Sequence, residues 1–135
     1  MAKRESSFQA SLIRTLHNLF EGCLVLKLDA KYLQGIPDLI ILYGPFWAML
    51  ECKKSENEPH QPNQDYYVEK GKSMAFASFI YPENVQQVLE DLRMYFYSMS
   101  EILYTDPQQI MQESLNEGKF IRDMIQKHNY EVAVA

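Results

Sequence analysis

The sequence predicts an α/β protein of three layers, in which helices cover both faces of a mixed central sheet of about four strands. Three observations support this prediction. Segments with a helical apolar period alternate with short apolar strands, turn residues separate them, and 47% of the 135 residues are hydrophobic, which is ample for a packed core. The predicted order is α-β-β-β-α-β-α, followed by a C-terminal helix.

Each element is predicted from its own period and its flanking turn residues. The first helix has apolar residues on one face and ends at Gly22, and a Gly-Ile-Pro turn at 35–37 precedes the second strand. Gly44-Pro45 joins the second and third strands as a hairpin. The predicted elements are a helix at 5–20, strands at 23–29, 38–43 and 46–54, a helix at 62–70 stopped by Gly71, a strand at 74–81 and a helix at 83–99.

The C-terminal region differs from the rest in charge. A further helix is predicted from Pro107 to about His128. Residues 82–135 carry four Lys or Arg against nine Asp or Glu, whereas the preceding part carries nine of each. We therefore expect a domain at 1–99 and an extension at 100–135, which either covers the core or binds a protein partner.

Composition excludes fewer function classes than it first suggests. The net charge of -5 does not exclude nucleic acid, because metal ions bound to acidic residues would make the local surface basic. No apolar run reaches the roughly 18 residues of a membrane span, and the chain start lacks a signal-like stretch, so we expect a cytoplasmic protein without membrane contact. Cys23 and Cys52 have neither metal-ligand nor disulfide spacing and are interpreted as buried free thiols.

The candidate chemistry lies between Gly35 and Lys54. Glu51 and Lys53 are two apart in a strand and so share a face, while Cys52 points to the opposite one. Asp38 opens the neighbouring strand of the hairpin and can lie beside Glu51. Two carboxylates suit Mg²⁺, and the backbone carbonyl of Cys52 could add a ligand. Lys53 could then orient an attacking water or stabilise charge on a phosphorus centre.

Each motif also has a purely structural interpretation. An Asp after Pro often only caps a turn, and a Glu-x-Lys at a strand end is often a solvated ion pair worth about 0 to 1 kcal/mol. The two motifs together, on adjacent apolar strands, favour a catalytic site more than either does alone.

In this order, the motifs resemble those of the PD-(D/E)XK nucleases, which have a restriction-endonuclease-like α-β-β-β-α-β core. Among these, the chain resembles the virus-type replication-repair nuclease (VRR-NUC) domain, which carries a Gly-x-Pro-Asp turn, a Glu-x-Lys strand and a Gln that opens a helix. The matching residues, within roughly 5–93, are Gly35-Ile36-Pro37-Asp38, Glu51-Cys52-Lys53 and Gln64, with Glu5 in the preceding helix.

The resemblance implies a Mg²⁺- or Mn²⁺-dependent endonuclease and assigns roles to these residues. Asp38, Glu51, Glu5 and the carbonyl of Cys52 would hold the metal, Lys53 would orient the nucleophilic water, and Gln64 would line the site. Gln34 stands where many relatives have Arg. The candidate DNA contacts are Gln9, Lys31, Gln34, Lys54 and His60.

The resemblance also implies a biological task. It suggests a small stand-alone, phage-like homodimer, similar to Holliday-junction resolvases, that cuts branched, flapped or junction DNA in recombination, repair or replication. The expected location is the cytoplasm, that of the host for a viral protein. Two alternatives stay open, namely a catalytically weak nuclease-fold module that binds DNA or protein, and a sequence-specific restriction-type nuclease.

Overall fold

A computed structural model of the chain describes residues 2–104, 112, 115–116, 118–119 and 122–123, with side chains for residues 7–103 and for the short later pieces. The elements follow the order predicted from the sequence. They are α1 (Ala2–Leu19), β1 (Leu24–Lys27), β2 (Leu39–Tyr43), β3 (Phe46–Cys52), α2 (Gln64–Met74), β4 (Phe76–Ile80) and α3 (Val85–Tyr104).

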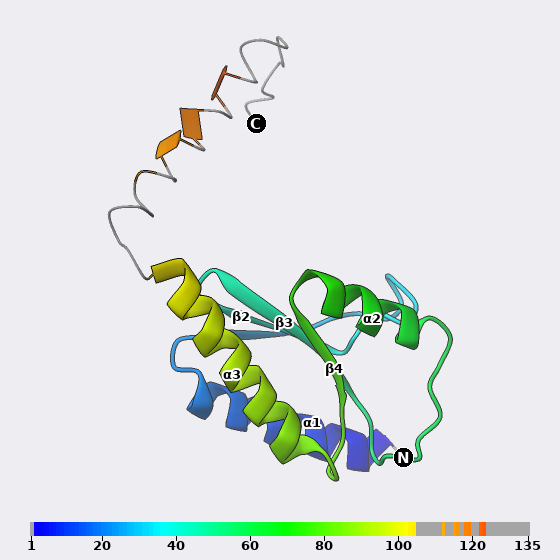
Figure 1. Cartoon of the computed structure of the whole chain (residues 1–135). Coiled ribbons are helices and arrows are strands. Elements are labelled where there is room, and N and C mark those ends of the chain that lie inside the picture. Colours follow the sequence, from blue (N-terminus) through cyan, green and yellow to red (C-terminus); the bar gives the residue numbers. More distant parts are fainter. Residues whose placement is uncertain (1, 105–111, 113–114, 117, 120–121, 124–135) are drawn as a thin grey trace. The chain divides into compact units, whose positions relative to one another are not determined.

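The four strands form one mixed sheet in the order β1-β2-β3-β4. β1 pairs with β2 and β2 with β3 in antiparallel fashion, so the predicted hairpin is present. β4 pairs with β3 in parallel, and α2 provides the crossover that a parallel pair needs. Because α1 and α3 lie against one face of the sheet and α2 against the other, the predicted three-layer α/β/α architecture is confirmed (Figure 1).

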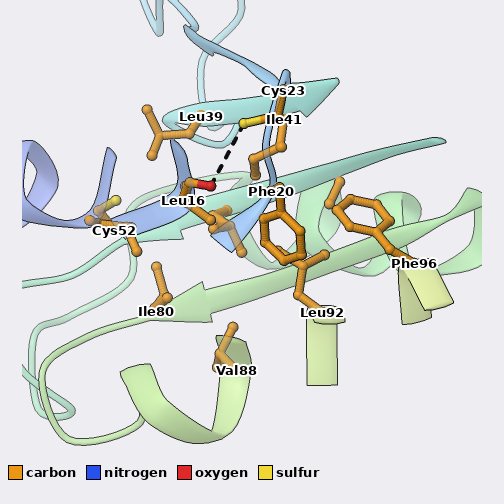
Figure 2. Packing of buried hydrophobic residues seen from close by; sticks show 13 residues of the cluster. Leu16, Phe20, Cys23, Leu39, Ile41, Cys52, Ile80, Val88, Leu92 and Phe96 are labelled. Atoms are coloured by element: carbon orange, nitrogen blue, oxygen red, sulfur yellow. Dashed lines mark hydrogen bonds between the residues drawn. The ribbon is translucent and has the colours of Figure 1, made fainter. Parts of the chain in front are cut away.

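The main core lies between the sheet and the helices α1 and α3 (Figure 2). Alternate residues of each strand point into it, because side chains two apart in a strand share a face. The buried residues include Leu12, Leu16 and Phe20 from the first helix and its end, Leu39, Ile41, Leu50, Cys52 and Ile80 from the strands, and Val88, Leu92 and Phe96 from α3.

Both cysteines are buried thiols, as predicted. The Sγ of Cys23 lies 3.8 Å from the carbonyl oxygen of Leu16, a contact drawn in Figure 2. Burial raises the pKa of the Cys23 thiol above its ordinary value, because the thiolate would lose its hydration.

The prediction that Gly71 stops the second helix is wrong, since α2 continues through it to Met74. A Cβ at Gly71 would lie 2.7 Å from the Cβ of Ala77 in β4. The glycine therefore lets the helix approach the strand closely. The helix also begins at Gln64 instead of 62, because Asn63 has a positive φ of 70° that no α-helix contains.

The last helix of the sheet region is longer than predicted. α3 ends at Tyr104 and not near Met99, since no Gly or Pro interrupts the chain there. The chain divides into two compact units, Met1–Tyr97 and Ser98–Ala135. The helix predicted from Pro107 to His128 lies largely outside the described residues, and a functional division at residue 99 stays a proposal. In the part that the structure describes, no helix is long and apolar enough to cross a membrane.

Candidate active site

Asp38 and Glu51 are brought together by the register of the β2–β3 hairpin. Leu39 pairs with Leu50, so the residue before β2 lies beside the residue after Leu50. The backbone N–H of Cys52 donates to Oδ2 of Asp38 at 2.9 Å, and the backbone N–H of Leu28 donates to the carbonyl oxygen of Asp38 at 2.8 Å. The Asp38 carboxylate is thus held against the end of β3.

The end of β3 presents two charged side chains on the face that α2 covers. Glu51 and Lys53 are each only 3% exposed, while Cys52 between them belongs to the opposite, apolar core. Burying a charged group is costly unless it is paired and hydrogen-bonded. The partners of these two side chains therefore determine what the site can do.

Gln64, the first residue of α2, connects Glu51 to Lys53. Its Nε2 donates to Oε2 of Glu51 at 3.2 Å, and its Oε1 accepts from Nζ of Lys53 at 2.6 Å. The same Oε1 accepts from the backbone N–H of Gln61 at 2.8 Å. One amide thus aligns the carboxylate and the ammonium with the start of the helix.

Lys53 has two further partners, both in the loop that follows β3. Its Nζ donates to the carbonyl oxygen of Pro59 at 3.2 Å and lies 3.6 Å from Oε2 of Glu58. Its backbone N–H donates to the carbonyl oxygen of Ile80 at 2.8 Å, which ties the end of β3 to β4. The ammonium therefore has Gln64 and Pro59 as hydrogen-bond acceptors and Glu58 as an ion-pair partner.

The turn that carries Asp38 is packed against the start of α2. Gly35 has a φ of +89°, and a Cβ there would lie 2.6 Å from the Cβ of Asn63 and 2.8 Å from the carbonyl oxygen of Pro62. Nδ2 of Asn63 donates to the carbonyl oxygen of Gln34 at 3.4 Å. The glycine of the Gly-x-Pro-Asp turn therefore sets the position of Asp38 relative to Gln64.

These residues surround a cavity of about 280 Å³. Its walls carry three carboxylates and two lysines, so the formal charge of the lining is negative and favours a cation. The lining residues are Asp38, Glu51, Lys53, Lys54, Glu58, Pro59, Gln61 and Gln64.

The donor set fits a hard divalent cation that keeps much of its water. Among the described residues, no group of three or more His, Cys, Asp or Glu side chains is arranged to hold a metal ion. Mg²⁺ needs fewer, because it is commonly bound by one or two carboxylates together with waters and substrate phosphate oxygens. Asp38 and Glu51 could supply those carboxylates, and Cys52, whose carbonyl is the predicted further ligand, follows Glu51 in the chain and donates its backbone N–H to Asp38.

The other predicted residues are distributed around this site and away from it. The side chain of Glu5 lies outside the described residues. Lys54 lines the cavity, whereas Gln9 is half-buried on α1 and does not line it. Lys31 and Gln34 are exposed in the turn region before β2 and do not line it either.

His60 is placed beside the cavity and not in its lining. Its ring stacks on Phe79 with centroids 4.0 Å apart, and its Nδ1 lies 2.7 Å from Oδ1 of Asp65. Phe79 is the register partner of Glu51 across the parallel pair, which places the imidazole next to the site.

Sequence reasoning missed the contribution of the loop after β3. Glu58, Pro59 and Gln61 line the cavity, although the segment reads only as a polar loop. Loops have no periodic pattern that orients their side chains. The one available signal is that this loop starts directly after Lys53 and returns to Gln64, so its residues must pass close to both.

Comparison with known proteins supports the fold. No family model and no curated protein matches the sequence. A solved structure described as "VRR_NUC domain" matches with a TM-score of 0.54 and 26% sequence identity, over 64% of this chain and 95% of that one. The chain therefore has a nuclease fold similar to that of the VRR_NUC domain, of the PD-(D/E)XK type that its motifs resemble.

Proposed function

We propose that the chain is a divalent-metal-dependent endonuclease that hydrolyses phosphodiester bonds in DNA. The observation that supports this most is the convergence of Asp38, Glu51 and Lys53 on one cavity, joined by Gln64, in a fold similar to a nuclease domain. A solvated ion pair at a strand end would leave its side chains exposed, whereas Glu51 and Lys53 are buried beside a cavity.

Each residue has a distinct task in the proposed reaction. Asp38 and Glu51, with the Cys52 carbonyl and Glu5, would hold Mg²⁺ or Mn²⁺, which when bound stabilises negative charge on the phosphoryl oxygens. Lys53 orients the attacking water with its ammonium and stabilises charge that develops on the phosphate. Gln64 keeps the carboxylate and the ammonium in register.

The bond changes in this reaction are simple. The water oxygen bonds to phosphorus, the bond from phosphorus to the 3′ oxygen breaks, and the water loses a proton while the leaving oxygen gains one. Positioning the water and the phosphate accounts for much of the rate in such reactions.

The proposal extends to the substrate and the assembly. DNA that is branched, flapped or joined in a Holliday junction is the proposed substrate, with Gln9, Lys31, Gln34, Lys54 and His60 as proposed DNA contacts. A homodimer, a phage-like origin and a cytoplasmic location belong to the same proposal, as does a protein partner for the acidic C-terminal segment. The branched-DNA substrate, the homodimer and the phage-like origin rest on the resemblance to VRR-NUC proteins, whereas the location and the protein partner rest on composition and charge.

The experiment is cleavage of labelled single-stranded, duplex, flapped, forked and four-way-junction DNA with Mg²⁺, Mn²⁺ or EDTA. We would compare the wild type with Asp38→Asn, Lys53→Met and the control Lys72→Met, whose lysine pairs with Glu69 on the surface. We expect metal-dependent cutting at the full rate only from the wild type and the control, with a strongly reduced residual rate in Asp38→Asn and Lys53→Met. Cutting in EDTA, or cutting by Asp38→Asn and Lys53→Met at the rate of the wild type, would contradict the proposal.

A further inference from the structure

Glu58 is an acidic residue of the site that belongs to none of the recognised motifs. It lies in the loop between β3 and α2, where glutamate side chains are normally exposed. Its side chain is only 10% exposed, lines the same cavity as Asp38 and Glu51, and places Oε2 3.6 Å from Nζ of Lys53.

The carboxylates of the site are divided between two kinds of partner. Glu51 accepts from the amide of Gln64, and Asp38 accepts from the backbone N–H of Cys52. Glu58 is an acidic partner of Lys53. Asp38 and Glu51 are thus placed to hold a cation, whereas Glu58 is placed to compensate the ammonium.

Both hydrogen-bond acceptors of the Lys53 ammonium are neutral. They are the carbonyl oxygen of Pro59 and the side-chain oxygen of Gln64. An ammonium has three donors and no acceptor, and a buried ammonium next to neutral oxygens alone is poorly compensated. Glu58 supplies a negative charge from the loop side, with its Oε2 3.6 Å from Nζ of Lys53.

The loop is attached at several points, so it can hold Glu58 in place. The backbone N–H of Glu58 donates to the carbonyl oxygen of Ser55 at 3.2 Å, and that of Gln61 donates to Gln64 at 2.8 Å. His60 follows Pro59 in the chain, and its ring stacks on Phe79 of β4. These contacts fix the backbone of the loop on both sides of Glu58.

We propose that Glu58 is a positioning residue, which holds the Lys53 ammonium at the cavity wall so that it faces the reacting phosphate. This inference rests on the proposed function. It predicts that Glu58 affects turnover and not DNA affinity, because removing a negative charge from the cavity does not weaken the binding of a polyanion.

The test measures kcat and KM for Glu58→Gln and Glu58→Asp. The matched control is Glu56→Gln, which removes the same charge from an exposed position in the same loop. We expect Glu58→Gln to lower kcat by about 10- to 100-fold with KM within about 3-fold of the wild type, as for displacement of a catalytic group by roughly 1 Å. Glu58→Asp should restore part of kcat, and Glu56→Gln should match the wild type.

A second arm asks whether Glu58 acts through Lys53. In a Lys53→Met background, Glu58→Gln should cause no additional loss of kcat. An unchanged kcat in Glu58→Gln, an effect confined to KM, or an equal loss in both backgrounds would overturn the inference.

A third arm does not depend on activity. The unfolding free energies of the wild type, Glu58→Gln, Lys53→Met and the double variant form a cycle. The two changes should be non-additive because the side chains are in contact. If the wild type cuts no DNA, the proposed function fails by itself, and this cycle alone then decides whether Glu58 holds Lys53. Additive free energies would overturn that placement.

Discussion

At the end of β3, consecutive residues point to opposite faces of the sheet, and the two faces bury side chains of opposite character. On the face covered by α1 and α3, Leu50 and Cys52 are fully buried among apolar side chains. On the face covered by α2, Glu51 and Lys53 are almost as deeply buried, yet each has polar or charged partners. Burial alone therefore does not distinguish core from site, whereas the partners do.

The difference has an energetic meaning. Apolar burial stabilises the fold in proportion to the area removed from water and needs no particular direction. Buried charges lose hydration, and their pairing often returns no more than it cost, so apolar residues could replace them with little loss of stability. The face covered by α1 and α3 therefore stabilises the fold. The buried charges on the face covered by α2 are better explained by the proposed catalytic role.

The largest expected effect is on cleavage by Asp38→Asn. The asparagine Oδ1 can still accept the Cys52 N–H bond, so the fold should persist, but the charge that would bind a metal is lost. We expect cleavage to fall by about 10³-fold, which corresponds to roughly 4 kcal/mol. The measurement is the single-turnover rate with Mg²⁺ together with the thermal unfolding midpoint. A rate close to that of the wild type would remove Asp38 from the site.

Leu50→Ala should have the opposite profile, with a large effect on stability. Leu50 is fully buried next to Glu51, and its truncation should lower the unfolding free energy by about 3 kcal/mol through lost burial and a cavity. Urea denaturation measures this directly. The matched control is Leu24→Ala in β1, since Leu24 is 58% exposed and should cost less than about 1 kcal/mol. Equal losses would mean that the core is not centred where the structure places it.

Gly35→Ala tests the contact between the Asp38 turn and the start of α2. The new Cβ would meet Asn63 at 2.6 Å while the residue keeps a φ of +89°, so strain and overpacking together should cost about 3 kcal/mol. Gly22→Ala is the control, because Gly22 also has a positive φ but has nothing within 4 Å of an added Cβ. It should cost only about 1 kcal/mol. Denaturant unfolding of both variants would reveal the difference, and similar losses would refute the close packing.

The smallest effect concerns pH and the core-face thiol of Cys23. Its pKa is raised in the folded protein by burial, so above the ordinary thiol pKa the unfolded chain releases a proton that the folded one keeps. The unfolding free energy should therefore fall slightly as pH rises from about 8 to 10. Denaturation at several pH values measures the slope, and Cys23→Ala should reduce it. An identical slope in the variant would exclude this contribution.

Much of the fold was predictable because its signals are local. The hairpin follows from Gly44-Pro45 between apolar runs, and the opposite directions of Cys52 and Lys53 follow from the two-residue period of a strand. Gly71 was misread as a helix stop because its reason is a contact with Ala77, which the neighbouring sequence does not contain. Glycine signals either a helix end or close packing, and only the partner decides which.

The sequence by itself determined the order of elements, the mixed α/β class and the pairing of Asp38 with the Glu-x-Lys strand, since period and turn chemistry act over a few residues. Only the tertiary structure decided that Gln64 joins Glu51 to Lys53 and that Glu58 approaches the Lys53 ammonium. Those contacts depend on the path of a loop and on the packing of Gly35 against Asn63. Loop paths result from long-range packing, which no periodic pattern in the chain specifies.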